Sequence, residues 1–241
     1  MTVHVEKRGP VVCVTIDRPE RRNAVDHEAL EGLADAVHGT DGARALVLTG
    51  AAGHFCAGAD LTGVEDQGFS LVLRRVLDGL RDAPFPTIAA VDGAALCAGT
   101  QLAVACDLRV ATAGARFGIP AARLGLMVDH WTVQRLAFLA GHGPARAMLL
   151  AAEVLNGDHA LRCGLVQRTG DLTDALGWAD DIAELAPLTI AGHKLALNRL
   201  EAAVGDDPEV TEAFSRAWRS ADLQEGLAAF RERRRPVFRG S

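Results

Sequence analysis

The chain has 241 residues and a mass of 25.4 kDa, and 49% of its residues are hydrophobic, so it can bury a full core as one large domain with a smaller helical appendage. Its 25 basic and 31 acidic side chains give a formal net charge of -6, which argues against a nucleic-acid-binding protein. The N-terminal sequence MTVHVEKRGP has no apolar signal core, and the longest apolar stretch, Thr87 to Cys106, is interrupted by Asp92 and Gln101. We therefore expect neither export nor a membrane span.

The cysteines indicate an intracellular chain without disulfides. They are odd in number, show no zinc-type pairing and lie mostly within apolar runs: Cys13, Cys56, Cys97, Cys106 and Cys163. We expect reduced, buried thiols in a cytoplasmic protein. No group of His, Cys and carboxylate side chains has the spacing of metal ligands, so we expect no metal site.

Strands and helices alternate in the first half of the chain. Short β-branched or apolar runs predict buried strands over 11–16, 45–49, 87–91 and 108–113. Between them, residues 27–38 and 69–81 carry apolar side chains at three- and four-residue spacing, which predicts helices. This order is typical of βαβ units and indicates an α/β fold.

The pattern becomes almost entirely helical beyond about residue 130, and only GLVQRT, residues 164–169, indicates another strand. The sequence shows no repeat of fixed period and no low-complexity linker. We expect an α/β core over residues 1–185, followed by a helical region over 186–241.

Two glycine-containing turns follow predicted strands, GHFCAGADL at 53–61 and DGAALCAGTQLAVACDL at 92–108. Neither has the glycine spacing of a dinucleotide-binding loop or a P-loop. Their small residues allow a ligand to approach backbone N–H groups closely, and two such donors, one of them at a helix N-terminus, are the parts of an oxyanion hole. Tight packing is the alternative explanation for the same small residues.

Four segments together make the chain resemble the crotonase, or enoyl-CoA hydratase/isomerase, superfamily. They are IDRPERRNAV (16–25), LVLTGAAGHFCAGADL (46–61), IAAVDGAALCAGTQLAVACDLRVATAGARFGIP (88–120) and EGLAAFRERRRPVF (225–238). The resemblance implies a spiral of ββα and βαβ turns and a C-terminal helical region used for trimerisation. It also implies a homotrimer or dimer of trimers, an acyl-CoA thioester as ligand, and no separate cofactor.

The resemblance assigns the oxyanion-hole donors to the N–H groups of Ala59 and Ala98. Residues that it implies to contact the thioester or coenzyme A are Arg22, Asn23, Ala24, Ala57, Ala59, Asp60, Leu61, Ala98, Gly99, Ala121 and Trp131. In the basic C-terminal segment, Arg233, Arg234 or Arg239 either meets the phosphates of coenzyme A or belongs to a solvated helix end.

Two carboxylates that hydratases of this family use as acid and base are replaced. The first position, in the helix after the oxyanion turn, is Gln101, and the second, after the FG-x-P element, is Ala121. An amide cannot transfer a proton at neutral pH, and a methyl group can neither donate nor accept one. Since a positioned acid or base contributes roughly 10²–10⁴-fold to the rate, we expect little hydratase activity.

One carboxylate remains at a position implied to lie near the thioester. Asp129 either acts as a lone base for a double-bond shift, organises the pocket together with Gln101, or caps a helix that begins near Thr132. A dehalogenase reaction is disfavoured, because the position that resembles that enzyme's catalytic histidine is Asp78.

The absent glutamates and the run VDHWTVQRLAFLAGHGPARAMLLAAE most resemble a mycobacterial subgroup of hydratase-like proteins that bind long-chain acyl-CoA in connection with fatty-acid elongation. Three functions follow as hypotheses: a non-hydrating acyl-CoA-binding protein, an enoyl- or dienoyl-CoA isomerase that uses Asp129, and a docking oligomer for enzymes of lipid metabolism with a vestigial acyl pocket. Pocket depth is expected to depend on the placement of the 62–72 loop and of the helix over 69–81, and the polar segment TGVEDQGF, residues 62–69, is expected to be mobile without ligand.

Overall fold

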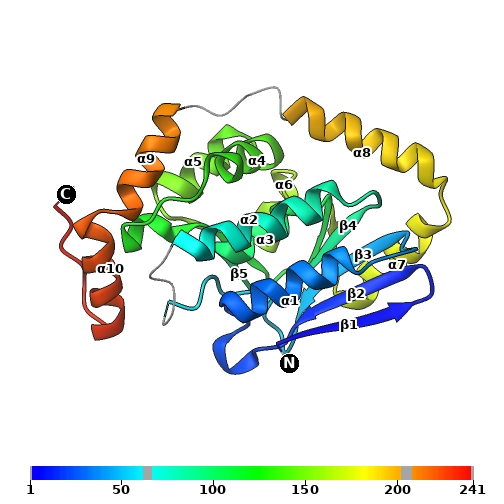
Figure 1. Cartoon of the computed structure of the whole chain (residues 1–241), viewed down its shortest axis with the longest axis horizontal. Helices are drawn as coiled ribbons and strands as arrows, with labels where there is room; N and C mark the ends of the chain where they lie inside the picture. The colour runs from blue at the N-terminus through cyan, green and yellow to red at the C-terminus, as the bar shows by residue number, and fades with distance from the viewer. Residues whose placement is uncertain (1, 62–66, 202–207, 240–241) are drawn as a thin grey trace.

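The computed structural model describes residues 2–61, 67–201 and 208–239 and shows a mixed α/β fold (Figure 1). Its strands are β1 (Val3–Arg8), β2 (Val11–Ile16), β3 (Ala45–Gly50), β4 (Thr87–Val91), β5 (Ala94–Leu96), β6 (Leu108–Ala111), β7 (Arg116–Gly118), β8 (Val154–Asn156) and β9 (Arg168–Thr169). Its α-helices are α1 (His27–His38), α2 (Gln67–Asp82), α3 (Ala98–Ala105), α4 (His130–Ala140), α5 (His142–Leu150), α6 (Gly157–Arg162), α7 (Leu172–Ala183), α8 (Pro187–Glu201), α9 (Pro208–Trp218) and α10 (Ala221–Glu232). Two 3-10 turns, Pro19–Arg21 and Pro120–Leu124, complete these elements.

The main sheet has the strand order β1-β2-β3-β4-β6-β9 within the described residues. Every pair is parallel except β1–β2, which forms an antiparallel edge. The central strands β2 to β4 are buried on both faces, which explains why they appear in the sequence as nearly continuous apolar runs.

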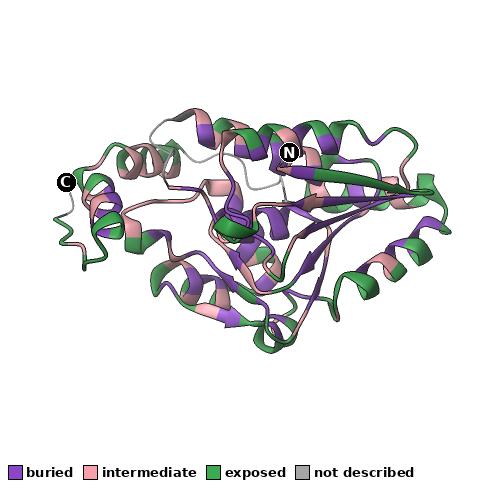
Figure 2. Cartoon of the chain, turned by 90° about the horizontal axis from the view of Figure 1, so that it is seen from below, coloured by how far each residue is buried: buried purple, intermediate pink, exposed green. Residues whose placement is uncertain are grey.

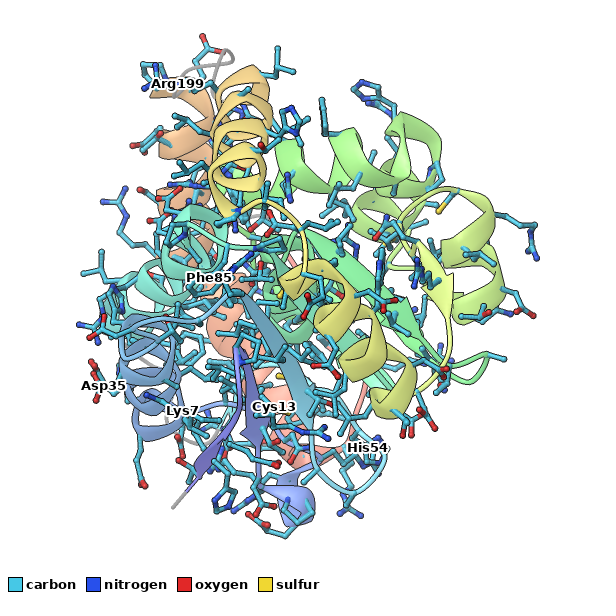
Figure 3. The ribbon with its side chains drawn as sticks, turned by 90° about the vertical axis from the view of Figure 1, so that its right-hand side faces the viewer. Lys7, Cys13, Asp35, His54, Phe85 and Arg199 are labelled. Atoms are coloured by element: carbon cyan, nitrogen blue, oxygen red, sulfur yellow. The ribbon has the colours of Figure 1, made fainter. Side chains whose placement is uncertain are left out.

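Helices cover both faces of this sheet, and successive side chains of a strand reach different cores. On β3, Leu46 and Leu48 belong to the core that includes α1 and α2, whereas Ala45 and Val47 pack toward α7. Figure 2 shows the strands as the most buried layer of the molecule. In Figure 3, Cys13 lies within this layer, while the exposed Asp35 lies on the outer side of α1.

A second, smaller sheet carries the strands that lead into the candidate site. Its order is β5-β7-β8, with β5 and β7 parallel and β7 and β8 antiparallel. Helix α3 follows β5 directly, and all of its residues are buried. The turn before α3 is therefore held between a strand of the smaller sheet and a buried helix.

The strand predictions over 11–16 and 87–91 and the helix prediction over 27–38 are confirmed to the residue, and the 45–49 strand and the 69–81 helix are confirmed within two residues. The strand predicted over 108–113 ends at Ala111. The one predicted over 164–169 is wrong for residues 164–167, because only the last two residues pair with β6. Sequence analysis missed β1, β5, β7 and β8, since β1 is a mostly exposed edge strand and the others have three residues each.

Helix α8 is held to the core by a buried lysine and carries exposed apolar residues elsewhere. Lys194 Nζ lies 2.7 Å from an Asp107 carboxylate oxygen and donates hydrogen bonds to the carbonyls of Leu80 and Phe85. Leu188 on the same helix is 87% exposed. Figure 1 shows α8 at one end of the molecule and α10 at the other, and Figure 3 places Arg199 at the far end of α8. The trimerisation role expected of residues 186–241 stays a prediction.

Among the helices of the described residues, none is long and apolar enough to cross a membrane. The mobile segment predicted over 62–69 falls largely on residues 62–66, which lie outside the described residues.

Candidate active site

Two turns from distant parts of the sequence meet through backbone hydrogen bonds. Cys56 N–H donates to the Ala94 carbonyl at 2.7 Å, and Leu96 N–H donates to the Cys56 carbonyl at 3.0 Å. Gly99 allows the close approach, because a Cβ at this position would lie 2.1 Å from the Cys56 carbonyl oxygen. The glycine-containing turns that were singled out from the sequence therefore form one unit.

This unit places Ala59 and Ala98 in the lining of the same cavity. Ala98 is the first residue of α3, where N–H groups have no acceptor within the helix. Among the described residues, neither the Ala59 N–H nor the Ala98 N–H has a hydrogen-bond partner. Two unpartnered donors at a cavity wall are what an oxyanion hole requires.

The cavity has a volume of about 220 Å³ and mostly apolar walls. Helix α2 contributes one wall at four-residue spacing, with Phe69, Leu73 and Leu77. Helix α9 contributes Phe214 and Trp218, and the Trp218 indole N–H donates to the Met127 carbonyl at 2.9 Å. These walls suit an aliphatic ligand.

Gln101 and Ala121, the two positions without a carboxylate, both line the cavity. The Gln101 amide is 7% exposed and donates from Nε2 to Thr132 Oγ1 at 2.9 Å and to Asp129 Oδ1 at 3.4 Å. Ala121 is 6% exposed and lies on the 3-10 turn that follows β7. The amide is thus an ordered hydrogen-bond donor, and the methyl group is part of the apolar wall.

Asp129 is the N-cap of α4 and also lines the cavity. Its Oδ1 accepts hydrogen bonds from the Thr132 N–H at 3.3 Å, from the Thr132 hydroxyl and from the Gln101 amide. Its Oδ2 pairs with Arg74 Nη1 at 3.0 Å. The capping position and the contact with Gln101 that the sequence offered as separate possibilities therefore occur together.

Arg74 was missed by sequence analysis, which treated its helix only as an amphipathic element. Its guanidinium pairs with Asp78 one helical turn later, with Nε 3.0 Å from Asp78 Oδ2, and with Asp129. It also stacks over the Trp131 ring at 4.4 Å. The available signal was the i,i+4 Arg–Asp pair, which by itself is an ordinary surface feature. Only the fold shows that Arg74 borders the cavity.

The turn that was predicted to contact coenzyme A lies beside the site, but its residues do not line the apolar cavity. Asn23 is fully buried, donates to the carbonyls of Ala51 and His54, and accepts from the Arg18 N–H. Arg18 also lies 3.2 Å from Asp60. These side chains build the turn.

Of the other residues at this turn, Arg22 is exposed. Its carbonyl accepts a hydrogen bond from the Ala57 N–H at 3.0 Å. Ala24 is buried, and its carbonyl accepts a hydrogen bond from the Arg18 guanidinium. Leu61, in contrast, does line the apolar cavity. Any contact of coenzyme A with residues 22–24 would therefore involve the exposed Arg22 or the backbone.

Trp131 lines a separate, larger cleft of about 1010 Å³ between α2, α4, α8 and α9 instead of the apolar cavity. In the basic C-terminal segment, Arg234 pairs with Glu225 at 2.9 Å between Nη2 and Oε2, and this arginine lowers the pKa of the Glu225 carboxyl to about 2. The Arg239 N–H donates to Asp222 at 2.7 Å. Acidic neighbours on α10 thus already engage this segment.

Cys97, the residue before Ala98 in the second turn, lines the cavity, and its φ angle is +47°. Burial raises the pKa of its thiol to about 11, so the thiolate is scarce at neutral pH. The five cysteines are free. Within the described residues, no group of three or more His, Cys, Asp or Glu side chains is arranged to hold a metal ion.

Comparison with known proteins gives the same family along the whole chain. Residues 6–241 match the enoyl-CoA hydratase/isomerase family. A protein of Mycobacterium tuberculosis named a probable enoyl-CoA hydratase is 44% identical over 99% of this chain and 100% of its own length. The crystal structure of an enoyl-CoA hydratase from Mycobacterium avium subsp. paratuberculosis has a TM-score of 0.87 at 26% identity, covering 99% of each chain. Methylmalonyl-CoA decarboxylase in complex with 2-nitronate-propionyl-CoA has a TM-score of 0.92 at 24% identity over 100% of this chain and 99% of its own, a similarity of fold.

Proposed function

The chain belongs to the enoyl-CoA hydratase/isomerase family, and from this premise we propose that it binds an acyl-CoA thioester without hydrating it. One observation carries the proposal. Ala59 and Ala98, whose N–H groups have no hydrogen-bond partner among the described residues, line the cavity, which presents Gln101 and Ala121 where hydratases of the family need their carboxylates. The donors support binding of a thioester carbonyl, and the absent acid and base argue against addition of water.

An isomerase with Asp129 as its sole base is the second candidate, because this carboxylate lines the cavity. A base must reach the substrate with a free lone pair. Asp129 instead accepts three hydrogen bonds at Oδ1 and the Arg74 guanidinium at Oδ2. Proton abstraction would have to compete with these donors, which favours the binding function.

The apolar walls supplied by α2 and α9 support an aliphatic acyl group. The proposal further includes assembly into a homotrimer or a dimer of trimers through the C-terminal helices. It also places the protein in the cytoplasm, in fatty-acid metabolism next to elongation enzymes. These finer points, and a long chain as the acyl group, rest on the family resemblance of the sequence.

The testing experiment incubates the protein with saturated, 2-enoyl, 3-enoyl and dienoyl CoA thioesters, followed by mass spectrometry and ultraviolet absorbance. Thermal unfolding measures binding in parallel, since a ligand at a hundred times its dissociation constant stabilises the native state by about 2.7 kcal/mol. Asp129→Asn removes the proton-accepting capacity and keeps a good helix N-cap. Asp171→Asn makes the same change at the N-cap of α7 and serves as the matched control.

Thioesters that raise the melting temperature and are recovered unchanged would support the proposed function. Conversion by the parent and by Asp171→Asn, but not by Asp129→Asn, would replace it with an isomerase. The absence of any binding would leave the hypothesis of a docking oligomer with a vestigial pocket.

A further inference from the structure

Two cavities of different size and polarity meet at a boundary of three residues. The apolar cavity of about 220 Å³ and the cleft of about 1010 Å³ are both lined by Arg74, Asp129 and Phe214. The remaining wall of the apolar cavity comes mainly from packed aliphatic and aromatic side chains. The boundary that the two spaces share therefore consists of a cation, its carboxylate partner and one aromatic ring.

Arg74 is held across this boundary by three partners on two helices. Asp78 binds one edge of the guanidinium from within α2, and Asp129 binds Nη1 from the start of α4. The Trp131 ring covers its face at 4.4 Å. A guanidinium that is paired at two edges and stacked on one face has little freedom to swing away.

The cleft beyond this boundary offers a surface that an extended aliphatic chain can cover. Trp131, Leu195, Val210 and Phe214 line it along with its charged groups. Each additional buried methylene improves affinity about fourfold. A methylene that instead meets the paired guanidinium gains no burial and would have to displace a charged group from its partners.

We propose that Arg74 is the residue that limits the acyl chain length, by closing the apolar cavity against the cleft. This inference rests on the proposed function, since it concerns the acyl group of a bound thioester. Affinity should rise with chain length until the tail reaches Arg74 and then stop rising. A protein without the guanidinium should continue to gain affinity with longer chains.

The test measures dissociation constants for butyryl-, octanoyl-, dodecanoyl- and hexadecanoyl-CoA by isothermal titration calorimetry. Arg74→Met removes the charge and keeps an unbranched helix-forming side chain. Arg75→Met is the matched control, because Arg75 lies next to it on α2, pairs with Glu31 and does not line either of the two cavities. Phe214→Ala opens the same boundary without changing any charge, so it tests the inference even if Arg74→Met unfolds.

We expect the affinity ratio of hexadecanoyl- to octanoyl-CoA to increase at least about tenfold in Arg74→Met, to increase in Phe214→Ala, and to keep the parent value in Arg75→Met. Parent-like ratios in both boundary variants, with thioesters still bound, would overturn the inference and leave the proposed function intact. A parent protein that binds no thioester would overturn the proposed function and this inference with it.

Discussion

The closest backbone approach in the site gives a quantitative prediction for Gly99→Ala. The added methyl carbon would lie 2.1 Å from the Cys56 carbonyl oxygen, whereas ordinary contact begins at 3.4 Å, so 3.4 − 2.1 leaves a displacement of about 1.3 Å. Overpacking of this kind costs about 1–3 kcal/mol. For a chain of this length each kcal/mol lowers the melting temperature by about 2–4 °C, so we expect a decrease of about 2–12 °C.

The same displacement would separate the N–H groups of Ala59 and Ala98, since Gly99 lies at the contact between their turns. Loss of two hydrogen bonds, each contributing about 0.5–1.5 kcal/mol, would weaken acyl-CoA binding between about fivefold and about 150-fold. Thermal unfolding and calorimetric titration measure the two effects. Gly143→Ala is the control, because a Cβ there meets nothing within 4 Å, and it should be neutral or slightly stabilising. If the two variants have the same melting temperature and the same affinity for acyl-CoA, the close approach at Gly99 does not support the site.

Three further predictions concern single groups. Burial raises the pKa of Cys97 from 9.0 to about 11, so iodoacetamide should label it about a hundredfold more slowly at neutral pH than free cysteine. Peptide mass spectrometry measures the labelling, and rapid labelling would contradict this prediction. Arg234 lowers the pKa of Glu225 from 4.5 to about 2, so this pair stabilises the fold above pH 4.5 and its contribution is lost as the pH falls toward 2. Glu225→Gln should therefore flatten the acid limb of the stability profile in urea unfolding, by a small amount because the pair is exposed, whereas an unchanged profile would exclude the linkage. Introducing glutamate at both Gln101 and Ala121 should raise hydration of a 2-enoyl-CoA at least about a hundredfold in an absorbance assay, and a folded, ligand-binding double variant without this gain would refute the acid–base argument.

Most of the α/β architecture is predictable from local sequence. The strands over 11–16 and 87–91 are continuous apolar runs because both faces of the parallel sheet are covered, and helix 27–38 has a strong apolar periodicity behind an Asp26 N-cap. Short strands such as β5 and β8 escape prediction because three residues carry no measurable periodicity. Their pairing depends on neighbours far away along the chain.

The candidate site divides in the same way between the sequence and the structure. The identities of Gln101 and Ala121, and hence the absence of the two carboxylates, follow from the sequence and its family resemblance. Asp129 caps α4 and also contacts Gln101 and Arg74. These contacts join residues that are 28 and 55 positions from Asp129 along the chain, so they depend on tertiary structure. Sequence periodicity describes each helix by itself, whereas the boundary at Arg74 exists only because tertiary packing brings α2, α9 and Asp129, the N-cap of α4, to one cavity.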